Sequence, residues 1–211
     1  MPAYMAWAME IRFIRGGFNE ADKIEGERHA RLALAHSSDD SMALSIAALV
    51  ILHLRNDFDA ASAAISRALS LNPSCAAAFY WGAHIHGFSS DQAIAEDHAN
   101  RGLRLSPFDP ISFNAYLSLG CVRARQRRFD DAAGFFARAV QINPRFSSLY
   151  AFQVAVLAMI GRADEAKSVV KRLLELEPNF RIGPLVASVV FLRPELLNLF
   201  AEGLRKAGLP E

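Results

Sequence analysis

The stretch "RFDDAAGFFARAVQINP", Arg128–Pro144, has two near-copies elsewhere in the chain. One is "NDFDAASAAISRALSLNP" at Asn56–Pro73, and the other is "GRADEAKSVVKRLLELEP" at Gly161–Pro178. A related stretch closes at Pro107, so the four closing prolines follow one another at steps of 34, 37 and 34 residues. A period near 34 residues is typical of stacked helical hairpins. The repeat therefore predicts an all-α fold in which each hairpin buries its apolar face against the next.

The columns of the repeat have a simple physical meaning. Within each copy the apolar residues fall three and four apart, which is the period of an α-helix. A small residue at the crossing point of two helices lets them approach closely, and the proline ends the second helix because it lacks an amide hydrogen. The alanine column consists of Ala61, Ala95, Ala132 and Ala166.

A short turn is expected between the two helices of each hairpin. Asn56 and Gly161 mark it in two copies, and both residue types tolerate the left-handed backbone conformation that closes a helix. Arg127 occupies the same place in a third copy. We expect its backbone to be mildly strained.

With these columns in place, the second helix of each unit resembles that of a tetratricopeptide repeat. The resemblance implies an all-α, right-handed superhelical solenoid of antiparallel hairpins, with about five repeats and a capping helix at the C-terminus. We treat the chain as one domain, 1–211. It divides into a degenerate repeat at 1–41, repeats at 42–75, 76–109, 113–146 and 147–180, and a C-terminal cap at 181–211.

The cap is expected to be an amphipathic helix that covers the open end of the stack, since an end hairpin has no neighbour on its outer face. Pro194 suits the first position of a helix, and Gly208 suits its end. The apolar face between them consists of Leu196, Leu197, Phe200 and Leu204.

The composition excludes several functional classes. The chain has 211 residues, 52% of them apolar, and a formal net charge of +1, which argues against a nucleic-acid surface. Cys75 and Cys121 show no metal-site spacing, and Glu10 and Arg12 interrupt the apolar core that an export signal would need. The uncharged run 146–161 is shorter than a membrane span and reads as a buried helix. These features predict a cytoplasmic protein that neither binds nucleic acid nor inserts into a membrane.

No catalytic motif is present. A phosphate loop, GxGxxG and HExxH are all missing, and His84 and His86 are two apart on a helix, so they point to different faces. The basic run "RARQRR", Arg123–Arg128, reads as a solvated helix end. We therefore expect no catalytic residue, no cofactor and no metal site.

Three further stretches, "RLALAHSSDDSMAL", "RGLRLSPFDP" and "AEGLRKAGLPE", resemble the carboxy-terminal repeat region of bacterial multidomain regulators. In those proteins the repeats follow an adenylate or guanylate cyclase domain or a winged-helix DNA-binding domain. The resemblance implies the regulatory part of a signalling protein, and the chain itself carries no cyclase segment.

The concave groove of such a solenoid is its usual binding surface, and the first helix of each hairpin supplies the wall. The repeat register predicts a mostly apolar groove, which disfavours a clamp for a terminal carboxylate and favours a protein partner's apolar segment or amphipathic helix. The chain's own segment after Pro178 is the alternative occupant. Self-association into a dimer is the alternative function. The predicted groove residues are Ile46, Val50, Leu54, Tyr80, His84, Phe88, Asn114, Leu117, Cys121, Arg125, Phe152 and Met159.

Overall fold

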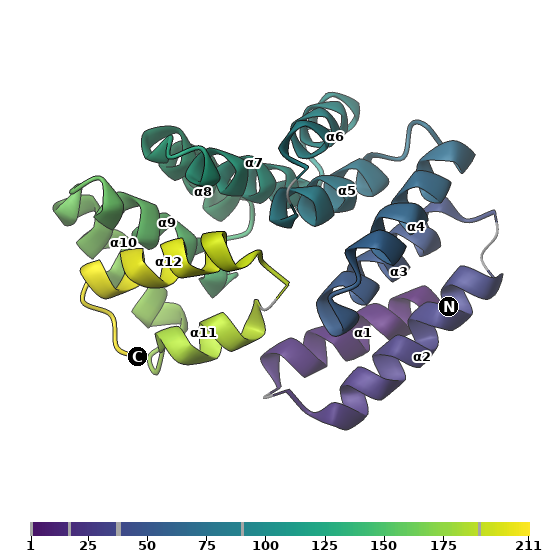
Figure 1. Cartoon of the computed structure of the whole chain (residues 1–211), viewed down its shortest axis with the longest axis horizontal. Helices are drawn as coiled ribbons and strands as arrows, with labels where there is room; N and C mark the ends of the chain where they lie inside the picture. The colour runs from purple at the N-terminus through teal and green to yellow at the C-terminus, as the bar shows by residue number, and fades with distance from the viewer. Residues whose placement is uncertain (1, 17, 37–38, 90, 190) are drawn as a thin grey trace.

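The computed structural model describes residues 2–16, 18–36, 39–89, 91–189 and 191–211 (Figure 1). The described part is helical and contains no strand, so the all-α prediction is confirmed. Successive helices pair into hairpins: α1 (Pro2–Arg15) with α2 (Glu20–His36), α3 (Ser41–Arg55) with α4 (Phe58–Leu71), α5 (Ala76–Phe88) with α6 (Gln92–Leu105), α7 (Phe113–Arg125) with α8 (Phe129–Ile142), and α9 (Ser147–Met159) with α10 (Ala163–Leu176).

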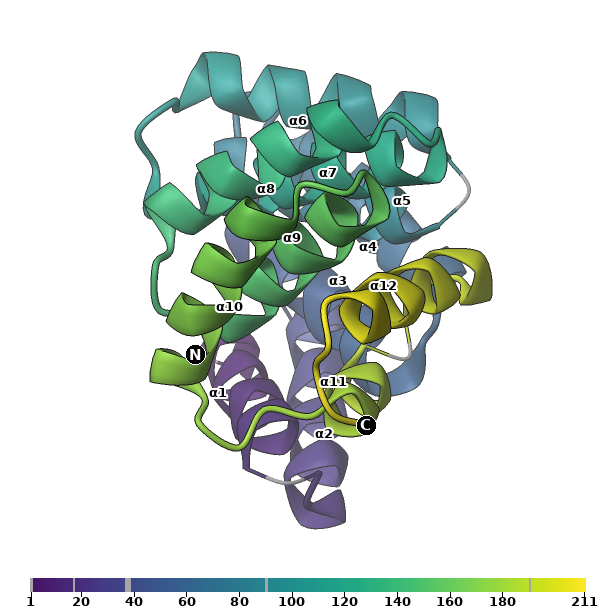
Figure 2. The ribbon, with the colours of Figure 1, turned by 90° about the vertical axis from the view of Figure 1, so that its left-hand side faces the viewer.

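The hairpins stack into an arch (Figure 1). The first helices of the first four hairpins pack against one another, α1 on α3, α3 on α5 and α5 on α7, whereas α9 packs on α8 of the preceding hairpin. The first helices α5, α7 and α9 lie toward the inside of the arch and α6, α8 and α10 toward the outside (Figure 2). A short 3-10 turn, Pro110–Ser112, lengthens the connection from α6 to α7.

The repeated residues act as the sequence predicts. Each closing proline stands two residues beyond the last residue of a second helix, at Pro73, Pro107, Pro144 and Pro178. The alanine column is buried where the helices cross, with Ala61, Ala95 and Ala132 at 0% exposure. At helix starts, Asp40 and Asp57 accept hydrogen bonds from the backbone N–H three residues on, which satisfies an otherwise free donor.

The predicted turns adopt the left-handed conformation. Asn56, Arg127 and Gly161 have φ angles of 53°, 60° and 74°. Arg127 is thus held in a conformation that costs a residue with a Cβ atom free energy, as expected. The uncharged run after Phe146 forms α9, whose inner residues are buried. Across the described residues, no helix is long and apolar enough to cross a membrane.

The C-terminal segment differs from the expected cap. α11 (Ile182–Ser188) and α12 (Pro194–Lys206) lie across the inside of the arch (Figure 1). A further repeat would contact both helices of the preceding hairpin, as α7 contacts α5 and α6. Instead, α12 packs on α9 and α7, the inner helices of two successive hairpins. This helix lies on the concave face, which is where the alternative of the chain's own segment after Pro178 as groove occupant places it.

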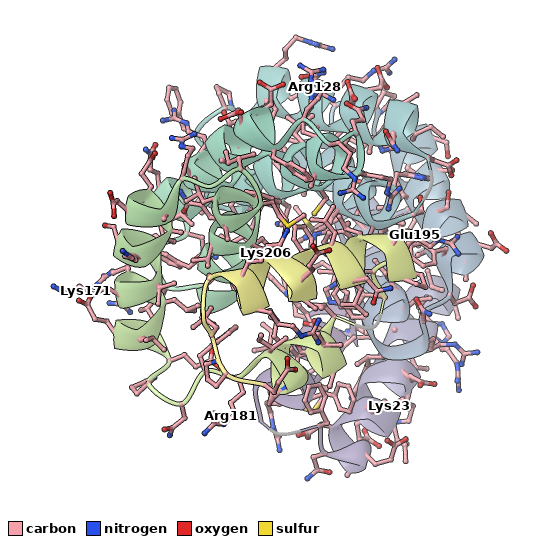
Figure 3. All side chains as sticks on the ribbon, turned by 60° about the vertical axis from the view of Figure 1, so that its left-hand side comes forward. Lys23, Arg128, Lys171, Arg181, Glu195 and Lys206 are labelled. Carbon is pink, nitrogen blue, oxygen red and sulfur yellow. The ribbon has the colours of Figure 1, made fainter. Side chains whose placement is uncertain are left out.

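The chemistry of α12 explains this position. Leu196, Phe200 and Leu204 are buried as expected, and Leu199 joins them, while Leu197 is only half-buried. Pro194 is the first helical residue, and Gly208 has a φ of 80° just beyond the end of the helix. Glu195 and Lys206 mark the two ends of the solvent-facing side (Figure 3). The helix is amphipathic as predicted, but its apolar face meets the groove.

Candidate functional site: a cavity on the concave face

The part of the groove that α12 leaves free contains a cavity of about 440 Å³. Helices α1, α3, α5, α7 and α9 supply its walls, and the segment that follows α11 closes one side. This volume falls in the range of small-molecule sites, which is about 300–1,000 Å³. Aromatic side chains dominate the lining: Trp7, Trp81, Phe88, Phe113, Phe146, Phe152 and Phe191.

Phe191 brings the C-terminal segment into contact with the N-terminal half of the arch. Its ring stacks on His53 of α3 with centroids 4.3 Å apart, and its centroid lies 5.3 Å from that of Phe88 on α5. His84 of α5 lies 4.2 Å from the Phe88 centroid on the same wall. Three elements that are distant in sequence thus meet around one aromatic cluster.

A chain of polar side chains runs along this wall. Glu10 Oε1 of α1 lies 2.6 Å from His53 Nδ1, and His53 Nε2 lies 3.0 Å from His84 Nε2. The side chains of Glu10 and His53 are only 6% and 10% exposed. All three residues line the cavity. A buried carboxylate needs such hydrogen bonds, because burial without them is costly.

This series of hydrogen-bonded side chains ends at His84. Its Nδ1 atom is buried and has no hydrogen-bond partner among the described residues. Burial lowers the pKa of His84 well below its ordinary value of 6.5, and the nearby His53 lowers it further. His84 is therefore neutral, so one of its ring nitrogens carries a proton and the other a lone pair.

The contacts among Glu10, His53 and His84 allow two arrangements of the protons. The Glu10 carboxylate accepts, so His53 Nδ1 donates to it. If His53 is neutral, its Nε2 must accept from His84 Nε2–H, which leaves a lone pair on His84 Nδ1. If His53 is protonated, its Nε2 donates to His84, which leaves an N–H on Nδ1. In either state the chain offers one unsatisfied polar atom beside an apolar cavity.

Five of the predicted groove residues line the cavity: His84, Phe88, Asn114, Leu117 and Phe152. They come from α5, α7 and α9, and the structure brings them together at one cavity. Asn114 is buried, and its Nδ2 donates to the carbonyl oxygen of Ile111 at 3.0 Å.

The predicted positions on α3 need correction. Ile46, Val50 and Leu54 are buried and do not line the cavity. Both helices of the first hairpin pack on α3, and Leu54 lies against Gly26 of α2. The stripe of α3 that faces the cavity carries Leu49 and His53 instead.

Tyr80 also lies elsewhere. It is fully buried between α5 and α6, where its hydroxyl donates to the carbonyl oxygens of Gly102, at 3.0 Å, and Ser106. Burial raises its pKa to about 12. Trp81, the next residue, takes the cavity-facing place. Tyr80 is therefore a core residue of its hairpin.

The remaining three predicted residues lie outside the cavity, toward α12. Cys121 is fully buried, which raises the pKa of its thiol. Arg125 donates to the carbonyl oxygens of Ser89 and Phe88, and burial lowers its pKa. Met159 is half-buried, with its sulfur 3.5 Å from Nζ of Lys206 on α12. α12, which belongs to the segment after Pro178 that is the alternative occupant of the groove, thus covers this part of it.

Sequence reasoning missed Glu10, His53 and Phe191. They are separated from one another by 43 and 138 positions and belong to no repeat column, so no spacing could have joined them. Trp7 was missed for the same reason, because it lies in the degenerate first unit, where no repeat column exists. Among the described residues, no group of three His, Cys, Asp or Glu side chains could hold a metal ion.

A family model described as tetratricopeptide repeat matches residues 83–145. The fold is a tetratricopeptide-repeat solenoid. The match spans the second half of α5 through α8, the region in which the repeat columns are most regular. No curated protein matches the sequence.

Solved structures of repeat proteins share the fold. PilW, a type IV pilus biogenesis factor, is 17% identical, with a TM-score of 0.66 over 96% of this chain and 92% of its own. Pseudomonas aeruginosa pilF is 13% identical, with a TM-score of 0.64 over 99% and 90%. YrrB, described as a tetratricopeptide-repeat protein with an unusual peptide-binding site, is 20% identical, with a TM-score of 0.53 over 85% and 92%. At these identities the likeness concerns the fold alone.

Proposed function

We propose that this chain is a non-enzymatic module that binds an amphipathic helix of a protein partner on its concave face. Recognition in such a groove rests on shape and on burial of apolar side chains, without a covalent step. The proposal is supported by the apolar character of the inner face and by the fold. A partner helix would present apolar residues at helical spacing to the inner wall.

The observation that carries the proposal is the position of α12. This amphipathic helix lies on α9 and α7, with Phe200 packed against Phe152 at a centroid distance of 4.5 Å. The concave face therefore already holds a helix of the kind that we propose as ligand. A partner helix would compete with α12 for the same wall, so α12 would limit its affinity.

The biological setting that we propose is the regulatory C-terminal part of a cytoplasmic bacterial signalling protein, such as an adenylate cyclase. The three stretches that resemble those regulators support it, and one of them, Ala201–Glu211, includes the end of α12 on the concave face. The coding sequence upstream of Met1 provides the test, since a fused catalytic or DNA-binding domain is the expected finding.

A labelled peptide tests the binding mode. The probe is the chain's own segment 194–211 with a fluorescein label, and the protein is the full chain with the substitution Phe200→Ala. This change weakens the internal helix, so the free peptide should bind more tightly to the variant than to the original chain. The matched control is Asn198→Ala on the exposed side of the same helix, which should leave peptide affinity unchanged.

Adding Phe152→Ala to the Phe200→Ala chain should abolish the gain in peptide affinity, because it removes the ring of α9 against which the helix packs. A scrambled peptide of the same composition controls for non-specific adsorption. If the Phe200→Ala chain binds the ordered and scrambled peptides equally, the concave face is not a helix-binding surface. Turnover of ATP or GTP by the purified chain, abolished by a point substitution in it, would contradict the non-enzymatic assignment.

A second function, self-association that pairs an attached catalytic or DNA-binding domain, is favoured by exposed apolar side chains at the ends of α4 and α6. Phe108 is 96% exposed, and Leu71 and Leu105 are 43% and 45% exposed at equivalent repeat positions. Large apolar side chains gathered on a surface often mark an interface. Light scattering over a concentration series separates the two functions. A dimer that Phe108→Ser converts to a monomer would favour self-association over helix binding.

A further inference from the structure

The cavity beside α12 has features that a helix-binding groove does not require. A groove that accepts only apolar side chains gains nothing from a buried carboxylate, yet Glu10 is 4% exposed and borders the cavity. The hydrogen bonds between Glu10 and His53 and between His53 and His84 follow the wall and stop at His84 Nδ1, which has no partner among the described residues.

His84 Nδ1 is costly to keep buried without a hydrogen bond. A buried polar atom without a hydrogen bond lowers stability, and native proteins rarely keep one without a reason. His84 is also packed edge-on against Phe88, which limits the freedom of its ring to turn toward another partner. A hydrogen-bonding group inside the cavity would satisfy it.

The aromatic walls of the cavity indicate that the rest of the occupant is apolar. Indole and phenyl rings from four helices, α1, α5, α7 and α9, and from the segment after α11 surround a volume of about 440 Å³. Sites for small organic molecules combine such apolar walls with a few convergent polar groups. Asn114 is held by its bond to the Ile111 carbonyl, so the Glu10–His53–His84 chain is the polar end that the cavity offers with an unsatisfied atom.

We propose that this cavity is a binding site for a compact apolar small molecule that carries one hydroxyl group, with the hydroxyl bonded to His84 Nδ1. A hydroxyl can both donate and accept, so it suits either proton arrangement of the histidine pair. The apolar body of the ligand lies among Trp7, Trp81 and Phe88. The site goes beyond the proposed helix binding, because it uses the part of the concave face that α12 leaves free.

The tryptophans make the site directly observable. The chain has two, Trp7 and Trp81, and both line the cavity, with ring centroids 5.9 Å apart. Intrinsic fluorescence of the full chain therefore reports on this cavity. Two probes of nearly the same shape serve the test, 1-adamantanol and 1-chloroadamantane, which differ in whether they carry a hydroxyl.

We expect 1-adamantanol to change the tryptophan emission saturably and to bind about fivefold more tightly than 1-chloroadamantane, the ratio that one net hydrogen bond gives. His84→Leu should reduce this preference to less than twofold. His98→Leu is the matched control: this histidine is also largely buried, but it lies between α5 and α6 outside the cavity, so the preference should remain.

A second variant keeps the proposal testable if His84→Leu does not fold. Ser148→Trp places a large ring at a half-buried cavity position and should weaken both probes at least tenfold. Equal affinities of the two probes, no saturable binding, or unchanged binding by Ser148→Trp would overturn the site. Tighter binding of 1-adamantanamine would overturn the hydroxyl assignment. Because these titrations contain no peptide, their failure leaves the helix-binding proposal standing.

Discussion

Phe152 of α9 and Phe200 of α12 pack with their ring centroids 4.5 Å apart and their planes inclined by 36°. Phe152 also lines the cavity, and Phe200 contacts Phe136 of α8 at 5.9 Å. One side chain thus belongs both to the cavity wall and to the surface that holds α12. Any change that lifts α12 from the groove removes one neighbour of the cavity, so docking of the helix and the shape of the cavity are linked.

Gly203 sets the distance between α12 and the groove. A Cβ atom at this position would lie 2.3 Å from the carbonyl oxygen of Ala155 on α9, which is backbone and cannot turn aside. Gly203→Ala should therefore lower the free energy of unfolding by about 1–3 kcal/mol, the usual cost of overpacking. Chemical denaturation measures it, and protease cleavage near α12 should become faster.

Helix propensity alone predicts the opposite sign for Gly203→Ala, a gain of about 1 kcal/mol. Gly134→Ala on α8 is the matched control, because Gly134 is exposed and a Cβ there meets nothing within 4 Å. If both substitutions stabilise the chain, α12 is not held as close to α9 as the structure places it.

The fold could be predicted from the sequence because each packing feature occurs in several copies of the repeat. The prolines, the alanine column and the left-handed turns each recur, so a single misreading does not change the result. Five of the predicted groove residues, on α5, α7 and α9, line one cavity. The division of the chain into repeats remains a prediction, as does the binding role of the groove residues.

The site could be predicted only in part, because its polar chain joins residues without a periodic relation. Glu10, His53 and Phe191 come from the degenerate first unit, the second hairpin and the C-terminal segment. The register also failed on α3, since it assumes a regular preceding hairpin, whereas α1 and α2 cover the stripe that ends at Leu54. The position of α12 depends on a helix that follows the last repeat, where no column exists.

A substitution in the turn of the fifth hairpin measures the effect of backbone conformation on stability without a steric clash. Gly161 is exposed, and a Cβ there would meet nothing within 4 Å, but its φ angle is 74°. Gly161→Ala should lower the free energy of unfolding by about 1–2 kcal/mol, because a Cβ is strained in the left-handed region. Arg127→Gly at the equivalent turn, with φ of 60°, should relieve strain and raise stability. Equal denaturation midpoints for Gly161→Ala and the original chain would contradict this interpretation.

Tyr80 offers a direct test of its reassignment from groove to core. Its hydroxyl donates to the carbonyl oxygens of Gly102 and Ser106, which close the second helix of its hairpin. Tyr80→Phe removes these bonds and should lower the free energy of unfolding by about 1–3 kcal/mol. Binding of 1-adamantanol should not change, because Tyr80 does not line the cavity. A loss of binding without a loss of stability would return Tyr80 to the groove.

The buried histidines predict how stability depends on pH. Burial lowers the pKa of His84 and His86, and burial followed by the nearby His86 lowers that of His98 to about 4. In the unfolded chain these groups take up protons near their ordinary value of 6.5. The unfolded state therefore binds more protons below pH 6.5, so their contribution to stability is complete above 6.5 and declines as the pH falls toward 4.

This window lies mostly above the range in which carboxylates titrate, so the histidines can be measured separately. Each proton taken up on unfolding lowers stability by at most about 1.4 kcal/mol per pH unit. Urea denaturation of the original chain at pH 7.5, 6 and 5 should show a steady decline, and His98→Gln should make that decline shallower. Parallel declines for the two proteins would mean that His98 takes up its proton equally in the folded and unfolded states. This result would contradict the burial of His98 between α5 and α6.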